Sequence, residues 1–165
     1  MRTSLSDTTP ESRLAPSTLD EQRLPVRARI AAAWTSFALL YVYVDHLHLY
    51  KPGIVEDILN GVVFRFDISQ GFVVFALASV AVPMLMIALS TTLPARVNRV
   101  SNLVVATLYI PYSVFNLSGG SWLWFYGLGV VLEVLLLAFI LRSAWTWPRR
   151  TASPTTEAVP VGAAG

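Results

Sequence analysis

Two acidic residues lie inside long apolar runs, where an ionisable side chain is costly and therefore marks a candidate functional site. Glu133 interrupts a run of valines and leucines, and at roughly 1.5 Å per helical residue it lies near the middle of that run. Asp45 lies in the outer third of another run, and His48 follows one helical turn later. Burial favours the protonated form of a carboxyl group, so such an acid could carry a proton, hold a cation or bind a polar group of a ligand.

A structural role is the alternative for Glu133. Its protonated carboxyl group could form a hydrogen bond with Tyr109, or donate one to the Thr107 carbonyl group that Pro111 leaves without a helical partner. The sequence favours this structural role over proton or ion handling and over a ligand or lipid pocket, and all three interpretations remain open.

Asp45 and His48 are spaced three residues apart, which places them on one face of a helix. We interpret them as a polar pair that caps the outer end of the first run, because His46 cannot share that face. A metal site would need further ligands from the loop that follows: Glu56, Asp57 or Asp67. We therefore expect no metal ion and no cofactor.

The composition excludes or disfavours several classes of function. The chain has no cysteine, which removes disulfides, thiolate metal sites and cysteine nucleophiles. It has no glycine-rich phosphate loop, no HExxH motif and no GxSxG motif. A net charge of +2 gives no reason to expect a nucleic-acid partner.

Membrane-spanning helices must position these residues. The chain is 55% hydrophobic and 13% charged, whereas soluble domains are roughly 45–50% apolar and about 25% charged. The excess gathers into four apolar runs, each close to the roughly 20 residues that span a bilayer. We expect an all-α, polytopic membrane protein with a four-helix transmembrane bundle over residues 30–142. The predicted spans are about 30–50, 71–93, 100–117 and 121–141, and an outer amphipathic loop with a short helix fills 51–70.

Polar residues form a stripe on each predicted span, and in membrane bundles such residues face inward. In the second span, Ser79, Pro83 and Ser90 share one face. We therefore expect one intramembrane polar network, made of Tyr41, Asp45, His48, Tyr109, Tyr112, Asn116 and Glu133.

The basic residues predict the orientation of the bundle. If the N-terminus is cytoplasmic, ten arginines flank the cytoplasmic ends of the spans and only Lys51 and Arg65 lie outside. Both termini are therefore expected in the cytoplasm. Trp34, Trp145 and Trp147 are expected at the inner membrane boundary. The polar tails, residues 1–29 and 143–165, are expected to be disordered.

Four stretches of the chain carry a resemblance to a known family: LYVYVDHLHLYKPG (40–53), FDISQ (66–70), LPARVNRVSNLVVATLYIPYSVFN (93–116) and LEVLLLAFILRSAWTWPR (132–149). Over residues 27–149 the chain resembles a bacterial family of small four-span membrane proteins, a domain-of-unknown-function family. The resemblance implies a location in the bacterial inner membrane. It implies no activity, substrate or catalytic residue.

The sparse polar interior favours a non-enzymatic membrane protein that acts as an interaction or accessory subunit. Its expected partners are the lipid bilayer and either a second copy of the chain or another membrane protein. One alternative is a small proton- or ion-coupled transporter or channel that uses Glu133 and Asp45. Another is a membrane-embedded enzyme that acts on a lipid or a quinone.

Overall fold

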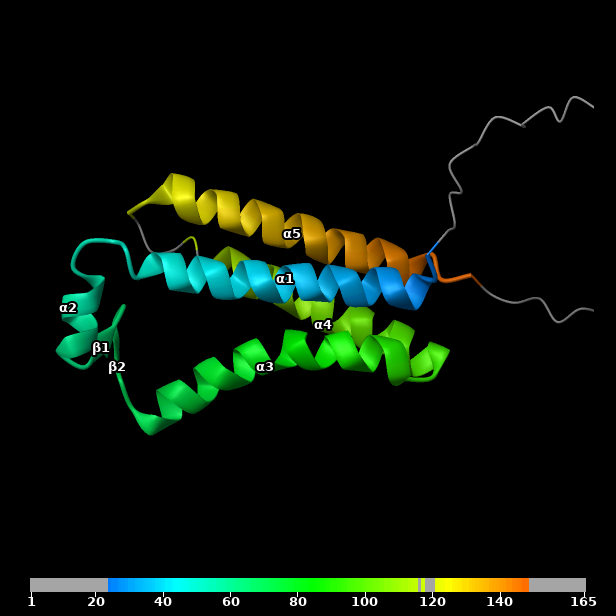
Figure 1. Ribbon diagram of the computed structural model, residues 1–165, viewed down its shortest axis with the longest axis horizontal. Coiled ribbons are helices and arrows are strands. Elements are labelled where there is room, and N and C mark those ends of the chain that lie inside the picture. The colour runs from blue at the N-terminus through cyan, green and yellow to red at the C-terminus, as the bar shows by residue number, and fades with distance from the viewer. Residues whose placement is uncertain (1–23, 116, 118–120, 149–165) are drawn as a thin grey trace, which may run out of the picture.

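The described part of the chain is mostly helical, as predicted, and also contains one small hairpin (Figure 1). The computed structural model describes residues 24–115, 117 and 121–148. In order, the elements are α1 (Val26–His48), α2 (Ile54–Leu59), β1 (Val62–Val63), β2 (Phe66–Asp67), α3 (Gln70–Thr92), α4 (Ala95–Phe115) and α5 (Leu123–Trp145).

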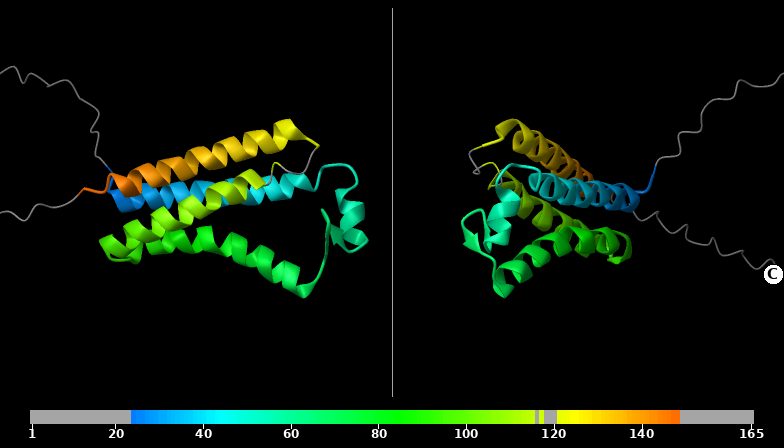
Figure 2. Two further views of the ribbon diagram at one scale, coloured as in Figure 1. Left: turned by 180° about the vertical axis from the view of Figure 1, so that it is seen from behind. Right: turned by 60° about the vertical axis from the view of Figure 1, so that its left-hand side comes forward.

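The four long helices form one bundle in which α1 packs between α3 and α5 (Figures 1 and 2). α5 also packs against α4, whereas α4 and α3 touch only sparsely. The start of α1, the turn between α3 and α4, and the end of α5 meet at one end of the bundle, which we name the tail end. α2 and the hairpin lie at the opposite end, which we name the hairpin end.

α3 bends in the middle, and its first half leans away from the other long helices (Figures 1 and 2). Pro83 lies inside this helix, and a proline removes one helical hydrogen bond and kinks the axis. The Ser69 hydroxyl oxygen caps the start of α3 by accepting a hydrogen bond of 3.2 Å from the Phe72 amide. The bend leaves room at the hairpin end, where α2 and the hairpin lie.

The predicted loop 51–70 contains α2, the short helix expected there, and a hairpin that the sequence pattern did not indicate. The hairpin pairs Val62 with Asp67 and Val63 with Phe66. Gly53 and Gly61 flank α2 with φ angles of 90° and 80°, a left-handed conformation that glycine adopts without strain. These turns allow the short loop to fold back over the end of the bundle.

At the tail end, α1, α4 and α5 extend a few residues beyond the predicted spans. α1 begins at Val26 rather than at residue 30, and α5 continues to Trp145, so residues 143–145 are helical rather than part of a tail. α4 begins at Ala95, directly after Pro94. The hydropathy pattern reports only the hydrocarbon-facing part of a helix, whereas polar turns can continue it into the headgroup region. Most of both tails and most of residues 116–120, between the last two predicted spans, lie outside the described residues.

The tail half of the bundle has a closely packed core. Its fully buried side chains include Trp34 and Phe37 of α1 and Leu137 and Ile140 of α5. Trp34 belongs to this core with its side chain 0% exposed, and its expected place at the inner membrane boundary stays a prediction. By contrast, Trp145 is 70% exposed, as a boundary residue would be.

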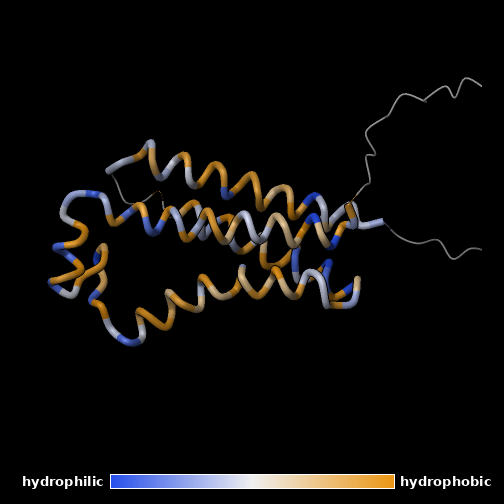
Figure 3. Tube along the Cα trace, in the orientation of Figure 1, coloured by the Kyte–Doolittle hydropathy of each residue, from blue (hydrophilic) through white to orange (hydrophobic). Residues whose placement is uncertain are grey.

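Among the described residues, α1, α3 and α5 are long and apolar enough to cross a membrane. α4 has 21 residues, roughly 32 Å of helix, but it is more polar than those three. Arg96, Asn98 and Arg99 lie in its first turns. Figure 3 shows the same pattern along the whole bundle, with apolar stretches between hydrophilic ends.

Candidate functional site

Glu133 lies in the middle of α5 and is buried within the bundle, with 1% of its surface exposed. Its Oε2 atom has no hydrogen-bond partner among the described residues. The Ser113 hydroxyl group of α4 faces the carboxyl group without reaching hydrogen-bond geometry, and Ser113 Oγ also has no partner there. A buried acid with an unpaired oxygen is rare in proteins, and packing alone does not account for it.

The predicted second acid, Asp45, lies close enough to Glu133 for the two carboxyl groups to interact electrostatically. The helices that carry them approach closely at Gly129, one turn before Glu133. A Cβ atom at Gly129 would lie 3.1 Å from Val44 Cγ2, so the absence of a side chain permits this contact. The close contact between α1 and α5 therefore brings the two acids into one region of the bundle.

His48 does not pair with Asp45 as the spacing predicted. Its Nδ1 atom forms a hydrogen bond with the hydroxyl group of Tyr126 on α5. Tyr126 was not among the predicted site residues, because its position near the start of the last span also fits a membrane-boundary tyrosine. The pair joins α1 and α5 at the hairpin end of the bundle, next to Asp45, which interacts electrostatically with Tyr126.

The Tyr109 hydroxyl group forms its hydrogen bond with a backbone carbonyl group rather than with Glu133. Its hydroxyl group donates a hydrogen bond of 2.7 Å to the Ser79 carbonyl oxygen of α3. In a regular helix the amide of residue 83 would donate to that oxygen, but Pro83 has no amide hydrogen. Tyr109 therefore satisfies the carbonyl group that the kink exposes. This is a common way in which membrane helices tolerate proline.

Five aromatic rings fill the space between α1 and α4, and we name them the aromatic column: Trp34, Phe37, Tyr41, Tyr109 and Tyr112. The hydroxyl groups of Tyr41 and Tyr112 form a hydrogen bond with each other, with 2.9 Å between the two oxygens. The predicted residues Tyr41, Tyr109 and Tyr112 thus lie together, on the tail side of Asp45.

A pocket of about 300 Å³ opens at the hairpin end above the aromatic column. Asp45, His48, Tyr112 and Tyr126 are among its lining residues, and every long helix contributes to the wall. Rings from the hairpin and from α3 complete it: Phe64, Phe66 and Phe72. Lys51 also lines the pocket, with Nζ 5.9 Å from the centre of the Tyr126 ring. A second cavity of about 270 Å³ adjoins it and shares Asp45 and His48.

A second polar group, which we name the asparagine network, lies in the tail half and consists of Trp34, Ser90, Asn98 and Asn102. Asn102 Oδ1 accepts a hydrogen bond of 2.6 Å from Trp34 Nε1, and Asn102 Nδ2 donates one of 2.8 Å to the Asn98 carbonyl oxygen. Asn98 Nδ2 donates one of 2.5 Å to the Ser90 carbonyl oxygen. All four side chains are fully buried, so the network joins α1, α3 and α4.

The sequence pattern places Ser90 on an inward face but does not indicate that Asn98 and Trp34 belong to a network. The spacing of Asn98, Asn102, Ala106 and Tyr109 at intervals of four, four and three residues would have indicated one buried stripe on α4. The predicted site residue Asn116 lies outside the described residues. The part of the chain that the structure describes contains no group of three or more His, Cys, Asp or Glu residues that could hold a metal ion.

Comparison with known proteins adds a family but no activity. Residues 20–153 match a family described as a family of unknown function, DUF6326. No curated protein and no solved structure matches the chain. The match covers most of the sequence and includes every described element, so the chain belongs to this family of unknown function, DUF6326.

Proposed function

We propose that the chain is a multi-pass protein of the bacterial plasma membrane with four spans. α4 is the span that joins the three candidates α1, α3 and α5. α4 turns its polar stripe inward and its apolar side chains outward: Val97, Val100, Val104 and Leu108 are 50–64% exposed. A helix with this arrangement is stable when lipid covers the outer face. Its length of roughly 32 Å matches a hydrocarbon core of about 30 Å.

The distribution of arginines supports a cytoplasmic tail end. Arg27 and Arg29 lie in the first turns of α1, Arg96 and Arg99 in those of α4, and Arg142 in the last turn of α5. These positions gather at the tail end of the bundle (Figure 1). The positive-inside rule then places both termini in the cytoplasm and the hairpin end outside.

Within this frame we propose that the protein is a non-enzymatic binding or accessory subunit whose hairpin-end pocket binds a small ligand with a cationic group. The observation that carries this proposal is the lining: one carboxyl group, Asp45, surrounded by aromatic rings in a pocket of about 300 Å³. Aromatic faces and a carboxylate together attract an ammonium group. The Lys51 ammonium group lies over the Tyr126 ring and repels a second cation there. The ligand's cation is therefore expected to lie deeper, against Asp45.

The packing below the pocket supports binding rather than conduction through a single chain. The aromatic column and the asparagine network fill the space between the pocket and the tail end with buried side chains. A ligand that enters from the hairpin end therefore meets a closed floor. The pocket suits a subunit that senses or presents a ligand on one side of the membrane.

Binding can be tested with phenethylammonium as the probe and phenylpropionate as a probe of similar size and opposite charge. The full chain in phosphatidylcholine nanodiscs is titrated by calorimetry. We expect the cation to bind, the anion not to bind, and Asp45→Asn to weaken binding about tenfold or more, because a buried charge pair is lost. Asp67→Asn is the matched control, since this exposed acid of the hairpin lines neither cavity. Equal binding of both probes, or equal loss in both variants, would overturn the proposal.

A second candidate function is proton or cation handling, and the unpaired Oε2 atom of Glu133 beside Asp45 favours it. Glu133 does not line the pocket, so Glu133→Gln should weaken phenethylammonium binding far less than Asp45→Asn does. A pH-sensitive dye inside liposomes measures proton flux at the same time. Flux that depends on Glu133 would establish the transporter function. No flux above empty liposomes would leave binding as the function of the site.

A further inference from the structure

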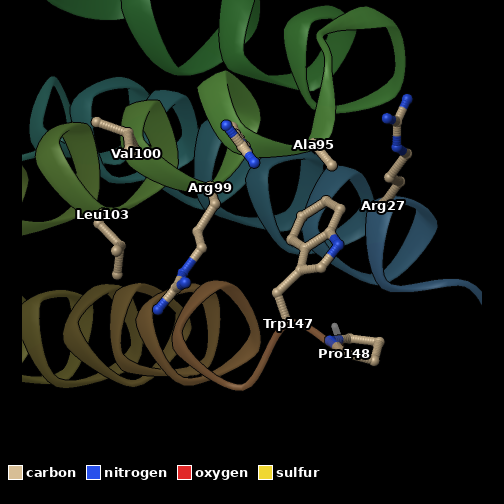
Figure 4. Close-up of a pocket in the computed structure, with 8 residues that line it drawn as sticks. Arg27, Ala95, Arg99, Val100, Leu103, Trp147 and Pro148 are labelled. Atoms are coloured by element: carbon tan, nitrogen blue, oxygen red, sulfur yellow. The ribbon is translucent and has the colours of Figure 1, made fainter. Parts of the chain in front are cut away.

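A separate hollow of about 1110 Å³ lies at the tail end, at the opposite end of the bundle from the ligand pocket. Three segments form it: the start of α1, the first turns of α4 and the residues that follow α5. Its polar lining consists of three guanidinium groups, those of Arg27, Arg96 and Arg99. Figure 4 shows Arg27, Arg99 and Trp147 coming from these three segments, with the Trp147 indole ring between the two arginines.

No negative charge of the described chain offsets these arginines. The acidic residues of this part of the chain lie in the middle of the bundle or at the hairpin end: Asp45, Glu56, Asp57, Asp67 and Glu133. Three like charges that line one hollow repel each other unless an anion joins them. The hollow therefore has the electrostatics of an anion site.

Two of the three guanidinium groups, those of Arg27 and Arg99, make contacts within the chain and keep donors free for a ligand. Arg27 Nη1 donates a hydrogen bond of 3.0 Å to the Thr91 carbonyl oxygen at the end of α3. The Arg99 guanidinium carbon lies 5.9 Å from the centre of the Trp145 ring. Arg99 Nε is buried and has no hydrogen-bond partner among the described residues. A guanidinium group has five N–H donors in a planar fork that matches the oxygens of a phosphate.

The rest of the lining is apolar, which distinguishes this hollow from a site for a small inorganic ion. Ala95, Val100 and Leu103 of α4 continue from the arginines toward the middle of the bundle. Val100 is 59% exposed on the outer face of the helix. The exposed Trp145 marks this level as the boundary between headgroups and hydrocarbon. A ligand that fits has a phosphate at one end and a hydrocarbon chain at the other.

We propose that this arginine hollow binds the phosphate group of an anionic phospholipid, whose acyl chain lies along the Val100 face of α4. A phospholipid headgroup and a soluble compound can both present a phosphate ester. Basic pockets between membrane helices are known to bind anionic headgroups. The lipid is the expected source because the apolar floor gives no stabilisation to a soluble phosphate ester. The site is independent of the ligand pocket at the hairpin end.

Native mass spectrometry of the full chain, released from mixed micelles, tests the proposal. The protein is offered phosphatidylglycerol or phosphatidylcholine of the same chain length. We expect retention of phosphatidylglycerol only, and the double variant Arg96→Gln/Arg99→Gln should reduce it about tenfold or more through the loss of charge-assisted hydrogen bonds. The control double variant Arg29→Gln/Arg142→Gln removes the same charge at the same end from residues that do not line the hollow.

The remaining arms of the experiment distinguish binding in the hollow from attraction to general surface charge and from binding of soluble phosphate esters. The variant Arg96→Lys/Arg99→Lys keeps the charge but loses the planar fork, so we expect an intermediate loss. Thermal unfolding of each variant in phosphatidylcholine alone shows that it is folded. Equal loss in the control variant would reduce the effect to general surface charge and overturn the proposal. Displacement by glycerol 3-phosphate at the concentration of the lipid would assign the site to soluble phosphate esters and overturn the lipid source.

Discussion

The hydrogen bond between Tyr109 and the proline kink makes a prediction that the structure specifies in detail. Tyr109→Phe removes the hydroxyl group but keeps the ring, which lies 6.3 Å from the Trp34 ring and 5.7 Å from the Phe37 ring. The Ser79 carbonyl group then has neither a helical donor nor the tyrosine. In a membrane protein such a loss is expected to lower the free energy of unfolding by about 1 kcal/mol, in a range of roughly 0.6–2.

The free-energy cost of Tyr109→Phe should also be measured in the Pro83→Ala variant, to complete a double-mutant cycle. An alanine at this position supplies an amide hydrogen, so the Ser79 carbonyl group regains a partner within its own helix. The same Tyr109→Phe change should then cost only a few tenths of a kcal/mol, and the difference is the coupling energy of the two sites. Tyr43→Phe is the matched control, because this tyrosine is 61% exposed on the outer face of α1.

Reversible unfolding in mixed micelles of a mild detergent and dodecyl sulfate, followed by circular dichroism, gives the free energies. A coupling energy near zero would refute the reasoning, since it would mean that Tyr109 stabilises the bundle through its ring alone. A cost for Tyr43→Phe equal to that for Tyr109→Phe would refute it as well.

Three further changes test other parts of the bundle. Asn102→Ala leaves a buried indole N–H without its acceptor and should destabilise the protein by about 1–3 kcal/mol in the same unfolding assay; a loss no larger than that of an exposed-site variant would contradict the network. Gly129→Ala forces a Cβ atom to 3.1 Å from an α1 valine and should destabilise by about 1–3 kcal/mol, whereas Gly127→Ala, with nothing within 4 Å, should have no such cost. Because the chain has no cysteine, Leu59→Cys at an 82% exposed position should react with a membrane-impermeant maleimide in intact cells, and Arg29→Cys only after lysis. The reverse labelling pattern would invert the proposed orientation.

The apolar runs predicted the long helices because hydrophobicity and the length of a span leave few alternatives. The helix ends were harder to predict, since α1 and α5 continue for a turn beyond the apolar residues. Glu133 and Asp45 could be selected from the sequence because ionisable residues are rare in apolar runs. The convergence of all the polar stripes on one network stays a prediction.

The partners of the site residues could not be predicted in the same way. Trp34 is a third of the way along α1, where a tryptophan fits either the boundary or the core, and only the rotation of the helix decides between them. The contact between Tyr109 and Ser79 depends on the alignment of α3 and α4, which no pattern within one helix contains. The aromatic wall of the pocket comes in part from a hairpin whose strands have two residues each, too short for a periodic signal.

In the proposed four-span topology, the polar stripe of α4 has a consequence for biosynthesis. Ribosomes make α4 before α5, yet α5 is the helix that α4 packs against most extensively, and α3 touches α4 only sparsely. During that interval Asn98, Asn102 and Ser113 would face lipid, which disfavours release of α4 from the translocon by itself. We therefore expect α4 and α5 to leave the translocon together as one helical hairpin. A nascent chain truncated before Leu123 would then lose two spans, with α4 left unprotected at the membrane surface.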